Sequence, residues 1–342
     1  MDSDINKRCA RGYMNRREFI ASVAMTAMLP MAARAQQSER PRRVDVLIAE
    51  LTEDDPYYEG RLAALTQGLR GFGWIDGQNL RLVIHRVSTK PAEIRKHITE
   101  LLAEQPAVVV SGGSTTTAPL LQATTSVPIV FTSAVDPVGA GFVESLAHPG
   151  GNATGFMQFD YSLSAKWLEL LKQLVPAIVR AGVIRDAMTP SGIAQFAVIQ
   201  SVASSLGIDI VPISVRDAGE VERGVAKLAR YPNAGLITAT GASVIGHRDL
   251  ILKLAAQFKL PSVFPNKTYV DRGGLVSYGA DQVLLARLAA GYVDRILKGT
   301  KPDDLPVQVP TKYELIINLK SAKVLGLELP ASVVARADEV IE

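Results

Sequence analysis

The chain has 342 residues, 47% of them hydrophobic, so it is long enough for two domains with a core each, and it is not a disordered protein. Residues 1–35 hold six of the 37 basic residues and three of the 34 acidic ones, which leaves 31 of each kind in the rest of the chain. The net charge of +3 therefore belongs to the N-terminal segment, and the nearly neutral remainder excludes the electrostatic footprint of a nucleic-acid-binding protein.

The N-terminal segment has the pattern of an export signal. Arg16 and Arg17 precede a modest apolar run at 21–29, and 33–35 is an A-x-A cleavage pattern. Paired arginines with a following Phe resemble a twin-arginine signal, although Asn15 stands where Ser or Thr is more usual. The apolar run is well short of the roughly 20 residues that a membrane-spanning helix needs.

We therefore expect cleavage after Ala35, a mature protein that begins at Gln36, and a periplasmic location. Whether translation starts at Met1 or at Met14 stays open. Cys9 is the single cysteine and lies upstream of the cleavage point, so we expect no disulfide, no thiol nucleophile and no lipid anchor in the mature protein.

Strands and helices alternate from the first apolar run onward. The runs 44–49, 80–84, 107–110 and 127–131 fit buried strands, and apolar residues recur at helical spacing between them. This alternation predicts an α/β protein with a parallel, doubly wound sheet.

Three polar turns follow strands of this first sheet, at 50–56, 111–117 and 132–137. Glycine, Ser and Thr in the second turn favour close approach of a ligand to backbone amides at a helix start. Because the carboxyl ends of parallel strands meet at one edge, these turns face a common crevice. Ordinary turns with capping residues remain the alternative at this point.

The alternation restarts after a Gly-rich interruption at 148–155. A weak internal repeat supports a second lobe of the same plan, since 107–131 and 234–264 share the order strand, polar turn, helix and strand. A strand at 273–279, a long helix after it and a return strand at 314–317 then predict three crossings between the lobes, which form a hinge.

The predicted division is an export signal at 1–35, a first lobe at 43–156 plus 280–306, and a second lobe at 157–279 plus 307–342. Catalytic motifs are absent, because the chain has no GK dipeptide, no G-x-S-x-G, no H-E-x-x-H and no C-x-x-C. The four histidines are scattered, and the acids at 53–55 fit a solvated helix start better than a cation site. We expect no enzyme, no metal and no cofactor.

Several stretches carry a family resemblance, most specifically DPVGAGF at 136–142 and PTKYELIINL at 310–319, with further likeness at 64–79, 128–152, 164–171, 247–251, 273–279 and 290–319. Through them the chain resembles the periplasmic substrate-binding proteins of ABC transporters, in the group with the tryptophan- and tyrosine-binding proteins. The resemblance implies a bilobed, type I periplasmic binding protein-like fold, a ligand between the lobes, delivery to an inner-membrane ABC permease, and no catalytic turnover.

The resemblance also implies the positions that line the ligand site. They stand in the polar turns and strand ends, namely Glu50, Ser114, Thr115, Ser133 and Asp136 on the first lobe and Arg185, Asp186, Thr240, Asn266 and Tyr269 on the second. Asp281, at the lobe junction, is placed to meet either the ligand or the hinge. Family relatives often have an apolar residue where this chain has Thr116 and Thr117, which leaves the shape of the ligand open.

The predicted ligand is an amino acid or a related small carboxylate, and an aromatic one is favoured by the family and by Tyr57, Tyr58, Phe131 and Tyr269 near strand ends. Hydroxyls and helix-start amides would take the carboxylate, and Asp136 or Glu50 the ammonium. We expect a monomer that binds no nucleic acid. The alternatives are an enzyme on the same fold, a sensing partner of a membrane signalling protein, and the sensor domain of a transcription regulator, although no helix-turn-helix precedes the first strand.

Overall fold

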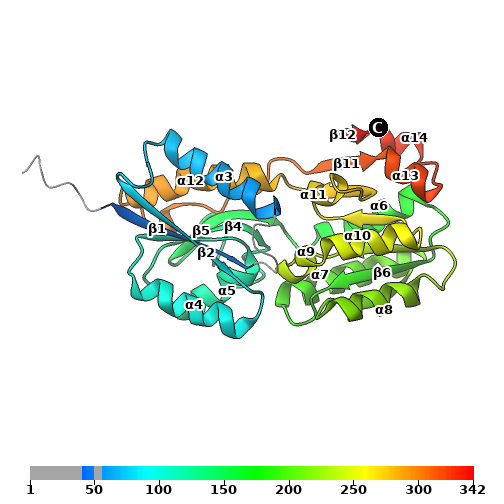
Figure 1. Cartoon of the computed structure of the whole chain (residues 1–342), viewed down its shortest axis with the longest axis horizontal. Coiled ribbons are helices and arrows are strands. Elements are labelled where there is room, and N and C mark those ends of the chain that lie inside the picture. Colours follow the sequence, from blue (N-terminus) through cyan, green and yellow to red (C-terminus); the bar gives the residue numbers. More distant parts are fainter. Residues whose placement is uncertain (1–40, 50–55) are drawn as a thin grey trace, which may run out of the picture. The chain divides into compact units, whose positions relative to one another are not determined.

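A computed structural model describes residues 41–49 and 56–342 of the chain, and Pro41–Glu342 form one compact unit. The predicted export signal and the acidic turn that holds Glu50 lie outside the described residues. The described part contains two β-sheets, each flanked by helices (Figure 1).

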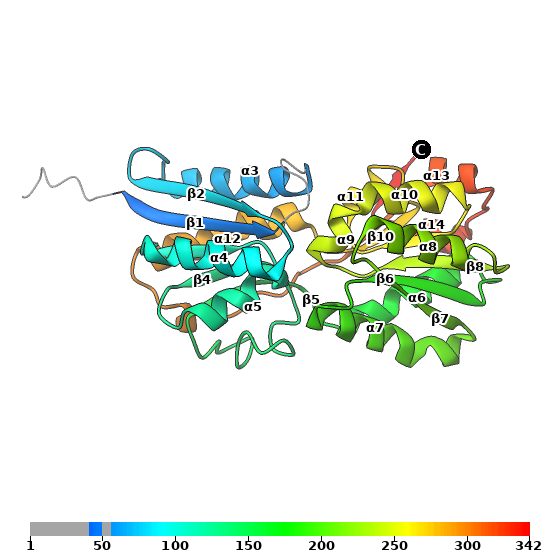
Figure 2. The ribbon, with the colours of Figure 1, turned by 60° about the horizontal axis from the view of Figure 1, so that its bottom comes forward.

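The first sheet is parallel and has the order β2 (Leu80–Val87), β1 (Arg42–Ala49), β3 (Val108–Ser111), β4 (Ile129–Val135) and β5 (Ala153–Phe159). Helices α3 (Pro56–Gly71) and α12 (Gln282–Leu297) lie on one face, and α4 (Pro91–Ala103) and α5 (Ser114–Ala123) lie on the other (Figures 1 and 2).

Alternation of side chains along β1 explains how both faces of this sheet are buried. Val44, Val46 and Ile48 pack toward α3 and α12, whereas Leu47 and Ala49 pack toward α4 and α5. Successive side chains of a strand point to opposite faces, so a sheet covered by helices on both sides needs continuously apolar strands.

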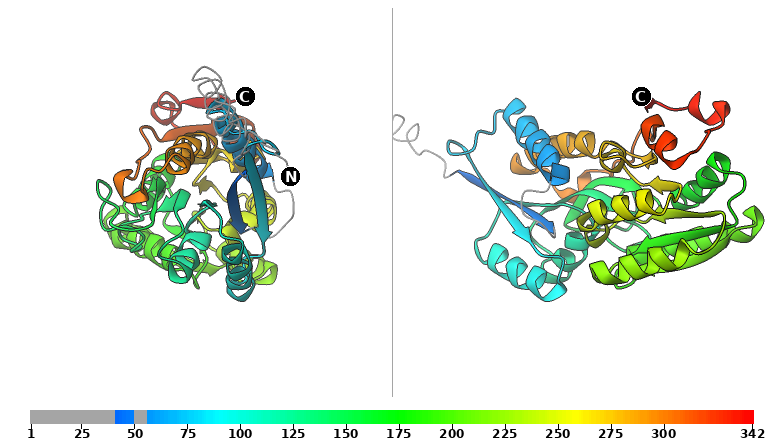
Figure 3. Two further views of the ribbon diagram at one scale, coloured as in Figure 1. Left: turned by 90° about the vertical axis from the view of Figure 1, so that its left-hand side faces the viewer. Right: turned by 45° about the vertical axis from the view of Figure 1, so that its right-hand side comes forward.

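The second sheet has the order β12 (Glu339–Ile341), β11 (Glu314–Asn318), β10 (Val276–Gly279), β9 (Ser262–Phe264), β8 (Ala234–Thr238), β6 (Arg180–Arg185) and β7 (Asp209–Ser214). The pair β10–β11 is antiparallel, and the other pairs are parallel. Figure 3 shows the C-terminal segment, with β12, beside this sheet.

Helices cover the second sheet on both faces as well. The cluster on one face includes residues of α8 (Ala218–Leu228) and α10 (Arg248–Gln257). On the other face, α6 (Leu163–Leu174) and α7 (Pro190–Ala203) pack around the fully buried Trp167. The remaining short elements are η1 (Ser204–Leu206), α9 (Ala242–Gly246), α11 (Lys267–Val270), η2 (Pro302–Asp304), α13 (Leu319–Leu325) and α14 (Ala331–Val334).

The chain passes between the two sheets three times. It leaves the first sheet between β5 and α6, returns between β10 and α12, and leaves again between η2 and β11. The third segment also extends the first sheet, because the Gln308 amide donates to the Gly155 carbonyl at 2.9 Å and the Gln308 carbonyl accepts from Met157 at 3.0 Å. The predicted fold class, two mainly parallel α/β lobes with three connections, is confirmed.

Both sheets repeat one strand order. The first five strands of each sheet, in chain order, lie in the sequence 2-1-3-4-5. In such sheets ligands bind outside the carboxyl ends of the strands, beside the point where the order reverses. Here these points lie between β1 and β3 and between β6 and β8. Among the described helices none combines the length and hydropathy of a membrane span.

Candidate functional site

A pocket lies at the carboxyl ends of the strands and is lined by residues of both sheets. Its empty space, together with the open solvent at its mouth, is about 540 Å³. Its lining comprises Ala49, Tyr58, Arg61, Gly112, Gly113, Ser114, Thr115, Thr116, Ser133, Val135 and Gln158 from the first-sheet side, and Ser191, Thr240, Gly241, Ala242, Ile245 and Asn266 from the second-sheet side.

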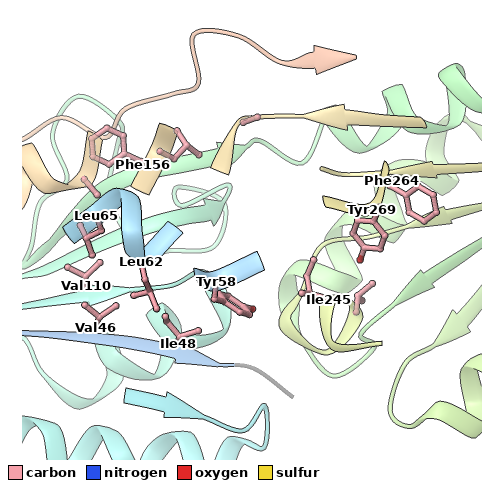
Figure 4. Packing of buried hydrophobic residues seen from close by; sticks show 14 of the residues in the cluster. Val46, Ile48, Tyr58, Leu62, Leu65, Val110, Phe156, Ile245, Phe264 and Tyr269 are labelled. Atoms are coloured by element: carbon pink, nitrogen blue, oxygen red, sulfur yellow. The ribbon is translucent and has the colours of Figure 1, made fainter. Parts of the chain in front are cut away.

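Figure 4 shows buried hydrophobic residues on the two sides of this region. Tyr58 lies at the end of the first-sheet cluster, next to Ile48 and Leu62, and Ile245, Phe264 and Tyr269 belong to the second-sheet side. The first side thus ends in an aromatic side chain that lines the pocket.

The turn between β3 and α5 is built by hydroxyl groups that bond back to the backbone. The Ser111 hydroxyl lies 2.6 Å from the Thr116 hydroxyl and 2.8 Å from that of Thr117, and both threonines donate to the Gly113 carbonyl. Thr116 and Thr117 are buried by these contacts. The pair that departs from the family pattern therefore holds the turn together.

This turn presents the start of α5 to the pocket. The Gly113 carbonyl accepts the amides of Thr116 and Thr117, and the first amides of the helix, at Ser114 and Thr115, have no intrahelical acceptor. The Ser114 hydroxyl accepts from the Val135 amide at 3.0 Å, which ties the turn to the end of β4. A helix start of this kind favours a negatively charged group.

Arg61 brings a cation to the same place. This residue of α3 is 6% exposed, and its guanidinium donates to the Gly112 carbonyl at 3.1 Å, to the Thr132 hydroxyl at 2.9 Å and to the Ser133 hydroxyl at 3.2 Å. Among the lining residues that the structure describes, Arg61 is the charged side chain.

Sequence reasoning missed Arg61. Its sequence signal is an arginine on the apolar stripe of a helix, three residues after Tyr58 and four before Leu65, both of which are buried. A charged side chain in that position either extends into solvent or donates to buried acceptors. Here Arg61 donates to acceptors at the ends of β3 and β4.

Ser133 has a strained backbone. Its φ of +65° lies in the left-handed region, which costs a residue other than glycine roughly 1–2 kcal/mol. The register of β4 against β5 shifts around this residue, and the Arg61 contact holds its hydroxyl. Strain of this kind often marks a binding site, and Ser133 lines the pocket.

On the second-sheet side, Gln195 of α7 holds the turn between β8 and α9. Its side-chain oxygen accepts from the Thr240 amide at 2.9 Å and from the Thr240 hydroxyl at 3.1 Å, and its nitrogen donates to the Thr240 carbonyl at 3.3 Å and to the Ser191 carbonyl at 3.0 Å. Gln195 is fully buried and was also missed from the sequence, because a single glutamine inside a helix gives no pattern.

Two further amides line the pocket with nitrogen atoms that have no hydrogen-bond partner. They are Gln158 near the end of β5 and Asn266 just after β9, each 3% exposed. The Asn266 oxygen accepts from the Thr268 hydroxyl, so its nitrogen is turned away from that contact. A buried donor left without an acceptor costs about 1–3 kcal/mol, so these nitrogen atoms are suited to an acceptor atom of a ligand or an ordered water in the pocket.

Five of the residues predicted from the sequence thus lie together in the lining: Ser114, Thr115, Ser133, Thr240 and Asn266. Glu50 lies outside the described residues. The other five do not line this pocket, and their contacts are as follows.

Asp136 and Asp281 each accept backbone amides. Asp136 accepts from Gly139 at 2.8 Å, and its charge is the second cause, after burial, of the raised pKa of Tyr161. Asp281 accepts from Val283 at 2.9 Å and Leu284 at 3.1 Å, and so caps α12.

Arg185, Asp186 and Tyr269 are held on the second-sheet side. The Arg185 guanidinium lies 4.5 Å from the ring centroid of Phe196, and Asp186 accepts from the Ser243 hydroxyl at 2.8 Å. Tyr269 is fully buried and stacks on Phe264 with 4.7 Å between ring centroids. In the part of the chain that the structure describes, no cluster of His, Cys, Asp and Glu could hold a metal ion.

Comparison with known proteins places this chain in a family. Residues 45–341 match the model of a family described as ABC transporter substrate binding protein. A tyrosine-binding protein from Clostridioides difficile (strain R20291) is 24% identical over 293 residues, which are 86% of this chain and 84% of that protein.

Solved structures show the same fold. A conserved domain protein from Vibrio cholerae aligns with a TM-score of 0.81 and 28% identity, over 88% of this chain and all of that one. An ABC domain from Streptococcus pneumoniae, solved in complex with L-Trp, aligns with a TM-score of 0.80 and 23% identity over the same shares.

Proposed function

Because the chain belongs to the family of ABC transporter substrate-binding proteins, we propose that it is an exported receptor that closes over a small molecule and delivers it to an inner-membrane permease. Its relatives are solute-binding proteins, and its sequence contains none of the catalytic motifs named above. The observation that carries the proposal is the pocket lined by strand ends of both sheets. A ligand in it contacts both lobes at once and favours the closed state by its differential affinity.

The proposed ligand is an amino acid or a related small carboxylate, with aromatic members as the class to test first. Three features support a carboxylate at the first-sheet side: the start of α5, the Arg61 cation and the hydroxyls of Ser114 and Thr115. Tyr58 in the lining and the printed ligands of two relatives, tyrosine and L-Trp, support the aromatic class.

The proposal includes the predicted division of the chain and its export. The first lobe would comprise 43–156 plus 280–306 and the second 157–279 plus 307–342, with the three connections as the hinge. The first 35 residues would direct export through the twin-arginine route. Exchanging Arg16 and Arg17 for lysine is then expected to abolish the periplasmic yield, and an unchanged yield would exclude that route.

A thermal-shift screen with small-angle scattering tests the receptor function. Amino acids, aromatic acids, their amides and short diamines are screened against the purified protein, and the best ligand is then added at saturation. We expect a carboxylate to raise the melting temperature and the radius of gyration to fall. A ligand of micromolar affinity that leaves the radius unchanged would contradict a closing receptor.

A further inference from the structure

Gln158 and Asn266 are two buried polar residues of the pocket, and the proposed carboxylate contact does not use them. Both side chains are 3% exposed, and each has an amide nitrogen without a hydrogen-bond partner. Gln158 stands near the end of β5 in the first sheet, and Asn266 follows β9 in the second. The two donors therefore enter one pocket from different sheets.

The orientation of Asn266 is set by a neighbour and not by chance. Thr268, two residues further on, donates its hydroxyl to the Asn266 oxygen, and only the nitrogen is left to make a new contact. A primary amide nitrogen can only donate, so it needs an acceptor atom from the ligand. The start of α5 and Arg61 are also donors, so the described lining is rich in donors on both sides.

We propose that Gln158 and Asn266 determine specificity by requiring a second oxygen acceptor on the ligand, separate from its carboxylate. A phenol hydroxyl, a carbonyl, a carboxamide or a second carboxylate would meet this requirement, and a plain hydrocarbon side chain would not. This inference rests on the proposed receptor function and specifies the chemical class of its ligand.

The physical basis is the asymmetry of hydrogen bonding in a closed site. A ligand with the acceptor pairs both donors, whereas an analogue without it leaves them buried and unpaired. Sites built to hydrogen-bond a substrate group reject the analogue that lacks it far more strongly than apolar pockets reject an extra group, by as much as 10⁴-fold or more. For an acceptor shared by two neutral amides we expect discrimination of about 30-fold or more.

The test uses pairs of ligands that differ by one acceptor group, measured by isothermal titration calorimetry on the purified protein. Suitable pairs are L-tyrosine with L-phenylalanine, 4-hydroxyphenylacetate with phenylacetate, and L-glutamine with L-norvaline. A molecule retained from the host and identified by mass spectrometry joins the panel with its deoxy analogue. The oxygen-bearing member of the pair that binds is expected to be the tighter by about 30-fold.

Isosteric variants then assign the preference to the two amides. Asn266→Leu and Gln158→Met have similar volumes and remove each amide donor without adding an acceptor for a phenol hydroxyl or a carboxamide. Each is expected to reduce the preference to about threefold or less.

Gln308→Met is the matched control. This glutamine does not line the pocket, and its nitrogen donates to the Tyr292 hydroxyl at 2.9 Å, so its exchange should leave the ligand preference unchanged. Equal binding of both members of a pair by the wild type, or an unchanged preference in the Asn266 and Gln158 variants, overturns the inference and leaves the receptor function intact. A wild type that binds no member of the panel and retains no molecule overturns the receptor function itself.

Discussion

The turn after β3 and the turn after β8 occupy equivalent places in the two sheets, yet they are held by different chemistry. Both stand beside the point where the strand order reverses, and both helices begin after a glycine with similar φ, +150° at Gly113 and +156° at Gly241. The weak sequence repeat thus corresponds to a repeated backbone plan.

The side chains around the two turns differ. The first turn is bound by hydroxyls and by the Arg61 guanidinium, and it opens a helix of 10 residues. The second turn is bound by the neutral amide of Gln195 and opens a helix of five residues. The start of the longer helix, with a cation nearby, suits an anion, whereas the neutral amide beside the second turn suits a dipolar group. We therefore expect the two halves of the pocket to bind different parts of a ligand.

The largest expected difference between the halves concerns stability. Asp45 of β1 is fully buried and accepts from Arg43 at 2.8 Å and from His85 at 2.5 Å, whereas Asp338 beside β12 is 29% exposed and pairs with Lys312 at 2.6 Å. Asp45→Asn should lower the free energy of unfolding by about 3–5 kcal/mol, and Asp338→Asn by less than about 1 kcal/mol. Denaturant titration of both variants measures this, and equal losses would contradict it.

The pH dependence of the same variant has a defined sign. Burial alone would raise the pKa of Asp45, but the hydrogen bonds from His85 and Arg43 outweigh it and hold the pKa below its ordinary value of 3.8. The ionised carboxylate therefore stabilises the protein above that value, and this stability is lost as the pH falls through the lowered pKa. The difference in free energy of unfolding between the wild type and Asp45→Asn should therefore become smaller below about pH 4.

The next largest effect concerns ligand affinity and compares the residues that hold the two turns. Arg61→Met removes three hydrogen bonds to strand ends and the cation of the pocket, so a carboxylate ligand should bind more weakly by roughly 2–5 kcal/mol. Gln195→Met disturbs only a neutral turn and should cost about 1–3 kcal/mol. Calorimetry on the folded variants measures both losses of affinity. A greater loss for Gln195→Met would contradict the assignment of the carboxylate to the first-sheet side.

A smaller effect on stability is expected at two glycines, one in each sheet, where a neighbouring carbonyl oxygen leaves no room for a Cβ. A Cβ at Gly155 would lie 2.0 Å from the Phe131 carbonyl oxygen, and one at Gly279 would lie 1.9 Å from that of Pro265. Alanine at either position should lower stability by about 1–3 kcal/mol. Gly291→Ala is the control. Gly291 lies within α12, and a Cβ there would meet only the Phe72 ring, at 3.5 Å, so the exchange should be neutral or stabilising.

The smallest effect concerns the hydroxyls of the first turn. Ser114→Ala and Thr115→Ala should each weaken a carboxylate ligand by about 1 kcal/mol, because the backbone amides at the start of α5 remain. A loss well above that in calorimetry would show that the hydroxyls, and not the amides, hold the ligand. Asp136→Asn removes the negative charge of the predicted ammonium contact. It keeps an oxygen that can accept from the Gly139 amide, so the contact within the turn is preserved.

How much of the site the sequence could predict depends on where each residue stands. Ser114 and Thr115 begin the helix that follows β3, Ser133 lies near the end of β4, and Thr240 and Asn266 stand two residues after β8 and β9. The carboxyl ends of parallel strands meet at one edge of a sheet, so these positions could be predicted. Gln158, Arg61 and Gln195 were missed because they stand within a strand or on helices, where the same residue types are usually exposed. The placement of Asp136, away from the lining, depends on a local turn that no pattern distinguishes from a ligand contact.

By itself the sequence determined the alternation of strands and helices, the two-lobe class and the strand ends that line the pocket, because local periodicity and connection rules carry this information. Only the tertiary structure decided which polar side chains are buried, which of them are paired and which are left as donors in the pocket. Pairing depends on atoms far apart in the chain: Arg61 reaches Thr132 and Ser133, and Gln195 reaches Thr240, through contacts that exist only once the helices have packed on the sheets.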